Sequence, residues 1–133
     1  MPDNGTLPVA VTFDYNGGTP NWTVPSPIVV DHGTVETIQW NLSCLNLPAN
    51  TTGRFANANP INFVTRKAGV NGDTWTGPGP TRVSDTQVTV SDDNRGPSPT
   101  TKSYFYSINV QTVDGNGNVT NWPDDPKVEN PGG

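Results

Sequence analysis

Cysteine, histidine and methionine each occur once in this chain of 133 residues, as Cys44, His32 and Met1. A single cysteine excludes an internal disulfide and fits a reducing compartment, although a bridge between two chains stays open. Catalysis of the Ser-His-Asp or Cys-His kind would depend on His32, which lies in the turn-like sequence Asp31-His32-Gly33 without a Gly-x-Ser-x-Gly motif. We therefore expect a non-enzymatic protein. The alternative is a small hydrolase that uses His32 with an acidic residue.

Positive charge is scarce as well. Seven Lys and Arg stand against 12 Asp and Glu, which gives a net charge of −5. An acidic chain with scattered cations does not follow a phosphate backbone, so nucleic acid is not an expected partner. No apolar run reaches the 18 residues of a membrane-spanning helix, and the N-terminus lacks the pattern of a signal peptide. We expect a soluble protein, cytoplasmic as the sequence stands, with no membrane partner. A secreted protein that has lost its signal peptide is the open alternative.

Turn-forming residues are abundant, with 14 Gly and 14 Pro, and most of them separate short apolar runs. This spacing disfavours helices. In the clearest run, Lys102–Val113, Tyr104, Tyr106, Ile108 and Val110 lie on one face of an extended strand. Further runs of strand type are Pro8–Tyr15, Ser26–Val30, Thr34–Leu42, Pro60–Arg66, Arg82–Val83 and Thr86–Val90.

Half-apolar strands of this kind cover one another as two sheets and need no helices. We predict an all-β fold, a single antiparallel Greek-key β-sandwich of about seven or eight strands. One domain is predicted over residues 1–133, since a chain of this length can bury one core. The segment at about 121–133 is rich in Asp, Asn and Pro and is predicted to be an irregular C-terminal tail.

The order of the runs resembles the layout of cupredoxin-like and immunoglobulin-like β-sandwiches. The run Thr34–Leu42, with its tryptophan, precedes a long loop, then Asn59-Pro60-Ile61-Asn62-Phe63, then Thr86–Val90 and finally Tyr104-Phe105-Tyr106. In cupredoxin-like proteins, the region after such a tyrosine strand holds copper ligands. A blue-copper site uses two His, one Cys and usually a Met, and this chain cannot supply that set. The resemblance thus implies the fold without copper.

A second resemblance lies at the C-terminus. Asp125-Pro126 and Glu129-Asn130-Pro131 are similar to the paired short motifs of the uncharacterised bacterial DP-EP family, with Asn130 interrupting the second motif. This resemblance implies a compact β-domain and no catalytic residues.

One segment has the residue types of a calcium site. Asp114-Gly115-Asn116-Gly117-Asn118 places oxygen-bearing side chains at every second position, and Asp125 follows after a turn, as suits a hard cation. Val119 stands where an EF-hand loop needs Gly, and Asp125 stands where it needs a bidentate Glu. We expect no cofactor. Calcium at Asp114, Asn116, Asn118 and Asp125 is the alternative to a plain Gly/Asn hairpin turn.

Three of the four tryptophans, Trp22, Trp75 and Trp122, lie among turn residues, whereas Trp40 lies in a strand-like run and is expected in the core. Loop tryptophans beside Asn and Asp would suit a sugar ring, which has an apolar face and many hydroxyl groups. Alternatively, they plug the ends of the sandwich. The sequence therefore predicts a binding or structural module that recognises carbohydrate or protein through loops. Self-association through edge strands, giving a homo-oligomer, is a competing role.

Overall fold

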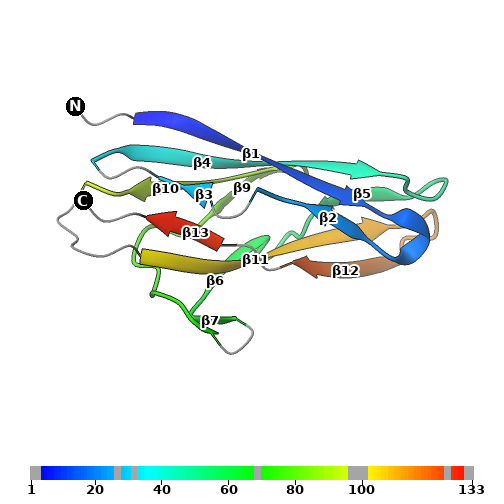
Figure 1. The fold of residues 1–133 in the computed structure, drawn as a ribbon. Helices are drawn as coiled ribbons and strands as arrows, with labels where there is room; N and C mark the ends of the chain where they lie inside the picture. Colours follow the sequence, from blue (N-terminus) through cyan, green and yellow to red (C-terminus); the bar gives the residue numbers. More distant parts are fainter. Residues whose placement is uncertain are drawn as a thin grey trace.

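The computed structural model describes residues 4–25, 28–30, 33–67, 70–95, 102–124 and 127–130. These residues form thirteen β-strands and one 3-10 helix, η1 (Asn16–Gly18), with no α-helix among them (Figure 1). The prediction of an all-β fold is confirmed. Two main sheets lie as two layers in Figure 1. Among the described residues, no helix has the length and apolar character needed to span a membrane.

The first main sheet has the strand order β2-β1-β4-β10-β9. Its strands are β1 (Asn4–Asp14), β2 (Asn21–Thr23), β4 (Val35–Leu45), β9 (Thr81–Ser84) and β10 (Gln87–Asp93). The pairs β1–β2, β4–β10 and β9–β10 are antiparallel, but β1 and β4 run parallel along their whole length. The prediction of a purely antiparallel fold is wrong here. Residues 15–34 separate β1 from β4, and a crossover of this length can return a strand in the same direction.

The second main sheet is built around β11 (Lys102–Val113). Two strands pair with one edge of β11, namely β5 (Thr52–Phe55) and β6 (Ile61–Val64), and two pair with the other, namely β12 (Val119–Asp124) and β13 (Lys127–Asn130). The short β3 (Ile28–Val29) joins β13 in parallel. Each edge of β11 is thus paired with two short strands in place of one long strand. This is one reason why the structure has more strands than the seven or eight predicted.

β12 and β13 correct the prediction of an irregular tail at about 121–133. Residues 121–124 and 127–130 are strands, and both segments are hydrogen-bonded to β11. Pro123 is tolerated because β12 pairs only with β11 in the described chain, so that the missing N–H of Pro123 falls on a sheet edge. The backbone of β11 decides the structure here, since Asp and Pro give this segment little strand propensity.

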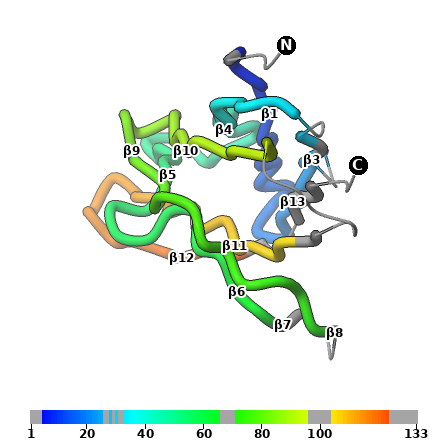
Figure 2. Tube along the Cα trace, turned by 90° about the vertical axis from the view of Figure 1, so that its left-hand side faces the viewer, coloured from blue at the N-terminus to red at the C-terminus, as the bar shows by residue number. Residues whose placement is uncertain are grey.

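A third, small sheet pairs β7 (Arg66–Lys67) with β8 (Val70–Asn71). In Figures 1 and 2 it extends away from the second main sheet.

One apolar core fills the space between the two main sheets, which Figure 2 shows from the end. Trp40 on β4 and Tyr106 on β11 are fully buried at its centre, which confirms the prediction that Trp40 is a core residue. The Trp40 indole N–H donates to the Tyr106 hydroxyl at 3.1 Å, and the two rings meet edge to face with centroids 5.4 Å apart. The alternating residues of β1, β4, β10 and β11 supply most of the other core side chains, namely Val9, Val11, Phe13, Ile38, Leu42, Val88, Val90, Tyr104, Ile108 and Val110.

One side of the sandwich is closed by polar contacts between the sheets. The backbone N–H of Phe55 donates to the Asp85 carbonyl at 2.7 Å. The Arg82 guanidinium donates to the Phe55 carbonyl at 3.2 Å and to the Asp85 carboxylate at 2.6 Å. β5 of the second sheet is therefore attached to the turn between β9 and β10 of the first.

Candidate functional site

The three tryptophans predicted to bind a ligand lie in two different surroundings. Trp22 on β2 and Trp122 on β12 both contact Phe13, with ring centroids 5.0 and 5.8 Å from it. Trp75, between β8 and β9, stacks on Phe63 at 4.3 Å with the rings nearly parallel. All three are half-buried and pack against the core. The structure therefore brings Trp22 and Trp122 to the core residue Phe13 and places Trp75 against Phe63, which is partly buried.

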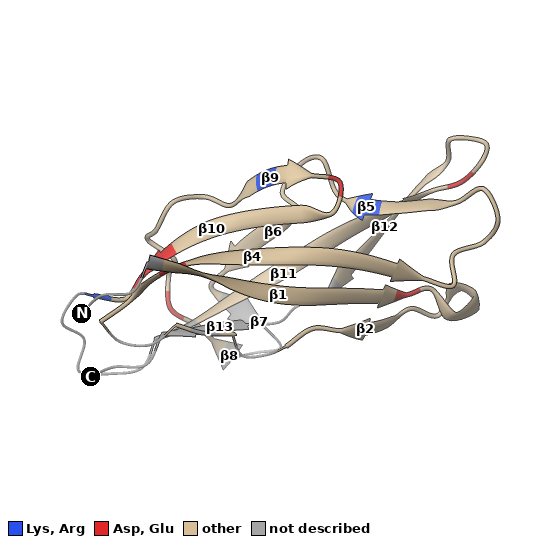
Figure 3. Cartoon of the chain, turned by 90° about the horizontal axis from the view of Figure 1, so that it is seen from above, with Lys and Arg blue, Asp and Glu red and all other residues tan. Residues whose placement is uncertain are grey.

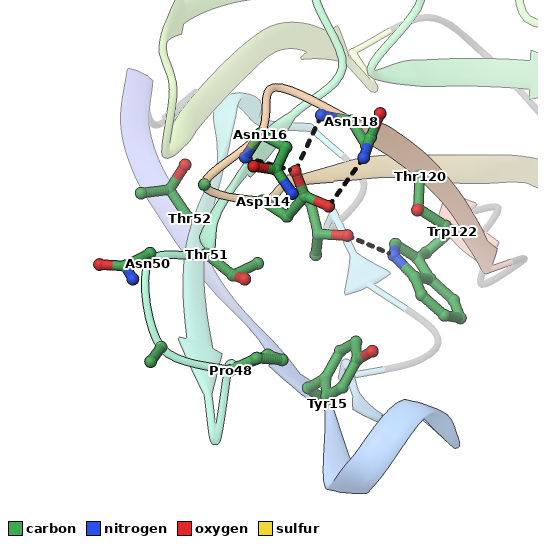
Figure 4. A pocket seen from close by; sticks show the side chains of 13 residues that line it. Tyr15, Pro48, Asn50, Thr51, Thr52, Asp114, Asn116, Asn118, Thr120 and Trp122 are labelled. Carbon is green, nitrogen blue, oxygen red and sulfur yellow. Dashed lines mark hydrogen bonds between the residues drawn. The ribbon is translucent and has the colours of Figure 1, made fainter.

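Trp122 also lines a cleft of about 910 Å³, which is larger than the two clefts in the described chain that Trp75 lines. This end cleft lies between the β4–β5 loop and the β11–β12 turn (Figure 4). The strands β1, β4 and β11 all end on this side of the molecule (Figure 1). Tyr15 and Trp122 form its aromatic wall. Neutral amide and hydroxyl side chains contribute much of the remaining lining, namely Asn50, Thr51, Thr52, Thr112, Asn116, Asn118 and Thr120.

The aromatic wall is held in place by the strands around it. Tyr15 follows β1, and its backbone N–H donates to the Leu45 carbonyl at 2.9 Å. The Trp122 indole N–H donates to the Thr112 hydroxyl at 2.9 Å, and Thr112 is buried. The two rings meet edge to face with centroids 5.9 Å apart. Because the Trp122 ring is held by Thr112 and the Tyr15 ring packs on it, little side-chain entropy of Trp122 would be lost on binding.

Asparagine shapes the β4–β5 loop at the other side of the cleft. Asn46 and Asn50 have φ values of 56° and 61°, a left-handed conformation that Asn accepts more readily than most residues. The Asn46 side-chain N–H donates to the Asp14 carboxylate at 2.9 Å, and the Thr51 N–H donates to the Pro48 carbonyl at 3.1 Å. The first bond attaches the loop to the end of β1, and the second forms a turn within the loop.

Asp114 organises the β11–β12 turn above the cleft (Figure 4). Its Oδ1 accepts the backbone N–H groups of Asn116 and Asn118, each at 2.9 Å, and its Oδ2 accepts the Asn118 side-chain N–H at 3.2 Å. Gly117, with φ +81°, completes the turn and donates its N–H to the Asp114 carbonyl at 3.0 Å. The hydrogen bonds from Asn118, followed by the one from Asn116, lower the pKa of the Asp114 carboxyl. Asp114 is therefore ionised at neutral pH.

Three of the four residues predicted to bind calcium, Asp114, Asn116 and Asn118, lie in this turn, and Asp125 lies outside the described residues. The part of the chain that the structure describes has no group of three His, Cys, Asp or Glu placed to hold a metal ion. Asn118 faces Asp114 with its amide nitrogen, so a cation would have to turn that amide and displace the N–H donors. Calcium at this turn stays a prediction.

The sequence also offered His32 and Cys44 as possible catalytic residues. His32 lies outside the described residues. Cys44 is half-buried on β4, and burial raises the pKa of its thiol, which favours the neutral form over the nucleophilic thiolate.

The other two clefts share Trp75. One, of about 550 Å³, includes Phe63 and Arg82, and the other, of about 820 Å³, includes Asp92 and Tyr104. In both clefts, one face of Trp75 is already stacked on Phe63 with the rings nearly parallel, whereas Tyr15 and Trp122 of the end cleft meet edge to face. Of the three clefts, the end cleft also has the largest set of Asn and Thr side chains in its lining.

Sequence reasoning had indicated Trp122 and the Asp114 turn, but not Tyr15, Asn50 or Thr52. Tyr15 follows β1, Asn50 lies in the β4–β5 loop and Thr52 begins β5, and only the pairing of β1, β4, β5 and β11 brings them together. Comparison with known proteins gives no help, since no family model matches the chain and no curated protein matches it in sequence.

Proposed function

We propose that this chain is a non-enzymatic binding module whose end cleft recognises carbohydrate. The observation that carries this proposal is the combination of the Tyr15 and Trp122 rings with surrounding amides and hydroxyls. Sugars have apolar faces that pack on aromatic rings and hydroxyl groups that exchange hydrogen bonds with Asn and Thr. The volume of about 910 Å³ leaves room for more than one sugar ring.

Protein recognition and self-association are supported less well. The exposed large hydrophobic side chains among the described residues are Leu45, Val83 and Val119, which lie on three different strands. A protein interface usually has a contiguous apolar centre. β9 and β12 each pair on one side only in the described chain, so edge-to-edge pairing of two copies is the competing proposal.

The hydrolase alternative would rest on His32. Among the residues that line the end cleft, Asp114 is the only carboxylic acid, and its two oxygens accept the hydrogen bonds that shape the turn. General acid–base catalysis needs a group that is free to exchange a proton with the substrate. The end cleft therefore favours binding over hydrolysis.

The fold supports a further part of the proposal, a cupredoxin-like Greek-key sandwich. The chain passes from β1 and β2 in the first sheet to β3 in the second and returns to β4 in the first. The region after the tyrosine strand, where cupredoxin-like proteins hold copper ligands, is here the Asp114 turn of the end cleft. None of the described residues that line it is Cys, His or Met, so we propose that this end of the fold binds a ligand other than copper. The resemblance to the DP-EP family stays a prediction.

Titration with neutral oligosaccharides of glucose, mannose, galactose and xylose tests the carbohydrate proposal. We expect saturable heat in calorimetry and a change in tryptophan fluorescence for at least one series. Replacement of Trp122 by Phe should weaken binding, because the ring becomes smaller and loses its bond to Thr112. The matched control is Trp75→Phe, which removes an indole outside the end cleft and should leave binding unchanged.

A second pair of variants avoids changes in the core. Asn116→Ala alters an exposed side chain of the end cleft, and Asn57→Ala alters an exposed side chain in another cleft. Only Asn116→Ala should weaken binding. The proposal is wrong if no series binds, or if both members of each pair bind equally well.

A further inference from the structure

The end cleft carries negative charge. Among the described residues that line it, Asp114 is the only charged one, and none is Lys, Arg or His. Asp14, next to Tyr15, adds a second carboxylate at the same end of β1. The first 53 residues of the chain have no Lys or Arg, and neither does the segment 103–126, so the basic residue nearest in sequence to the lining is Arg54, two residues after Thr52.

The described arginine side chains form hydrogen bonds or ion pairs with residues outside the lining of the end cleft. Figure 3 shows basic residues on β5 and β9, which are Arg54 and Arg82. Arg54 donates to Gln111 at 3.2 Å, and Arg82 donates to Asp85 and to the Phe55 carbonyl. Arg95 forms an ion pair with Asp93 at 2.9 Å, at the end of β10 that pairs with the start of β4. The end cleft lies where β4 finishes, so Arg95 is at the opposite end of that strand.

The carboxylate of Asp114 cannot easily leave the site. Three hydrogen bonds hold it in the turn, and the Cβ that an alanine would add at Gly115 would lie only 3.1 Å from Cβ of Asn50. The turn therefore packs closely against the β4–β5 loop at Asn50. A ligand in the cleft meets a fixed negative charge, and no described residue of the lining carries a positive charge.

We propose that the end cleft selects neutral and amino sugars and excludes sugars that carry a carboxylate or a sulfate. This selectivity rests on the proposed carbohydrate binding. An anionic sugar would lose hydration on entry, gain no cationic partner and be repelled by Asp114 and Asp14. A protonated amino sugar would instead be attracted by the same two carboxylates. We expect the anionic form to bind about tenfold or more weakly than the neutral form at low salt.

The test compares ligands of one length and linkage. The probes are the β-1,4-linked tetramers of glucose, glucosamine and glucuronic acid, together with the tetramers of mannose and mannuronic acid. Dissociation constants are measured by calorimetry at low salt and again at high salt. The neutral and amino tetramers should bind, the uronic tetramers should bind about tenfold more weakly, and salt should reduce the difference because it screens the repulsion.

Two variants locate the effect. Asp114→Asn removes the charge but keeps an oxygen that can accept the N–H groups of Asn116 and Asn118, so the ratio of neutral to uronic affinity should fall toward one. Asp93→Asn removes a charge that pairs with Arg95, away from the cleft, and should leave the ratio unchanged.

The outcomes separate the two proposals. If a neutral and its uronic tetramer bind equally well, the selectivity is wrong and the carbohydrate site stands. If none of the tetramers and none of the neutral series binds, both proposals are wrong. An unchanged ratio in Asp114→Asn would overturn the assignment of the selectivity to Asp114.

Discussion

The contact between Trp40 and Tyr106 should contribute measurably to stability, because it is a hydrogen bond between the two sheets inside the core. Both side chains are fully buried, and the donor and acceptor atoms are 3.1 Å apart. Tyr106→Phe keeps the ring and removes the hydroxyl that accepts the Trp40 N–H. A buried donor that loses its partner costs about 1–3 kcal/mol, so we expect a loss of that size in the free energy of unfolding.

A double-mutant cycle separates this bond from packing. Trp40→Phe removes the indole donor and leaves unfilled space, so the single variant should be strongly destabilised. In that background, Tyr106→Phe no longer strands the indole N–H and should cost less than it does alone. The two changes should therefore be coupled by roughly 1 kcal/mol or more, within the range seen for residues in contact.

Urea unfolding followed by circular dichroism gives these free energies. Tyr15→Phe serves as the control, since Tyr15 is half-buried at the surface and should change stability by less than about 0.5 kcal/mol. A Tyr106→Phe variant as stable as the wild type, or a coupling close to zero, would refute the conclusion that this bond helps to hold the sheets together.

Three other predictions concern single positions. A Cβ at Gly53 would overlap Sγ of Cys44, so Gly53→Ala should lower the free energy of unfolding by about 1–3 kcal/mol, as urea unfolding would measure. Adding Cys44→Ala should restore much of this free energy, and additive effects of the two changes would contradict the clash. Because burial raises the pKa of the Cys44 thiol, iodoacetamide should react with the native protein more slowly than with the urea-unfolded chain at pH 8. Because the folded pKa of Asp114 is lowered, its contribution is present above the unfolded pKa of about 3.9 and is lost as the pH falls through the folded value. Below about pH 4, the wild type should therefore lose stability more steeply than Asp114→Asn, as thermal unfolding would show, and equal slopes would contradict the shift.

The all-β fold could be predicted because most of the long strands alternate. Val9, Val11 and Phe13 of β1 face the core, and β11 follows the same rule with Tyr104, Tyr106 and Ile108. This pattern tells which face of a strand is buried, but not which strand lies beside it or in which direction. The parallel pairing of β1 with β4 therefore had no local signal. β12 and β13 were missed because their partner is the backbone of β11, whereas their own residues are typical of turns.

The candidate site also combines residues that a local pattern predicts with residues that only long-range pairing brings together. Trp122 and the Asp114 turn were recognised because each has a local pattern. Tyr15 and Asn50 were not, since they reach the cleft only through long-range pairing. In the part of the chain that the structure describes, the four non-glycine residues with positive φ are all asparagines, namely Asn16, Asn46, Asn50 and Asn59. These four asparagines therefore serve the connections between strands, and two of them lie in the β4–β5 loop beside the cleft.

The central position of β11 also sets the order in which the second sheet can form while the chain is being synthesised. β5 and β6 have β11 as their only sheet partner in the described chain, and β11 ends at Val113, well after β6 ends at Val64. At about 5–20 residues per second, this delay lasts several seconds. During that time, β5 and β6 expose unpaired backbone to neighbouring nascent chains. We expect a fragment that stops before Lys102 to aggregate, whereas a fragment that reaches Val113 can close this edge of the sheet.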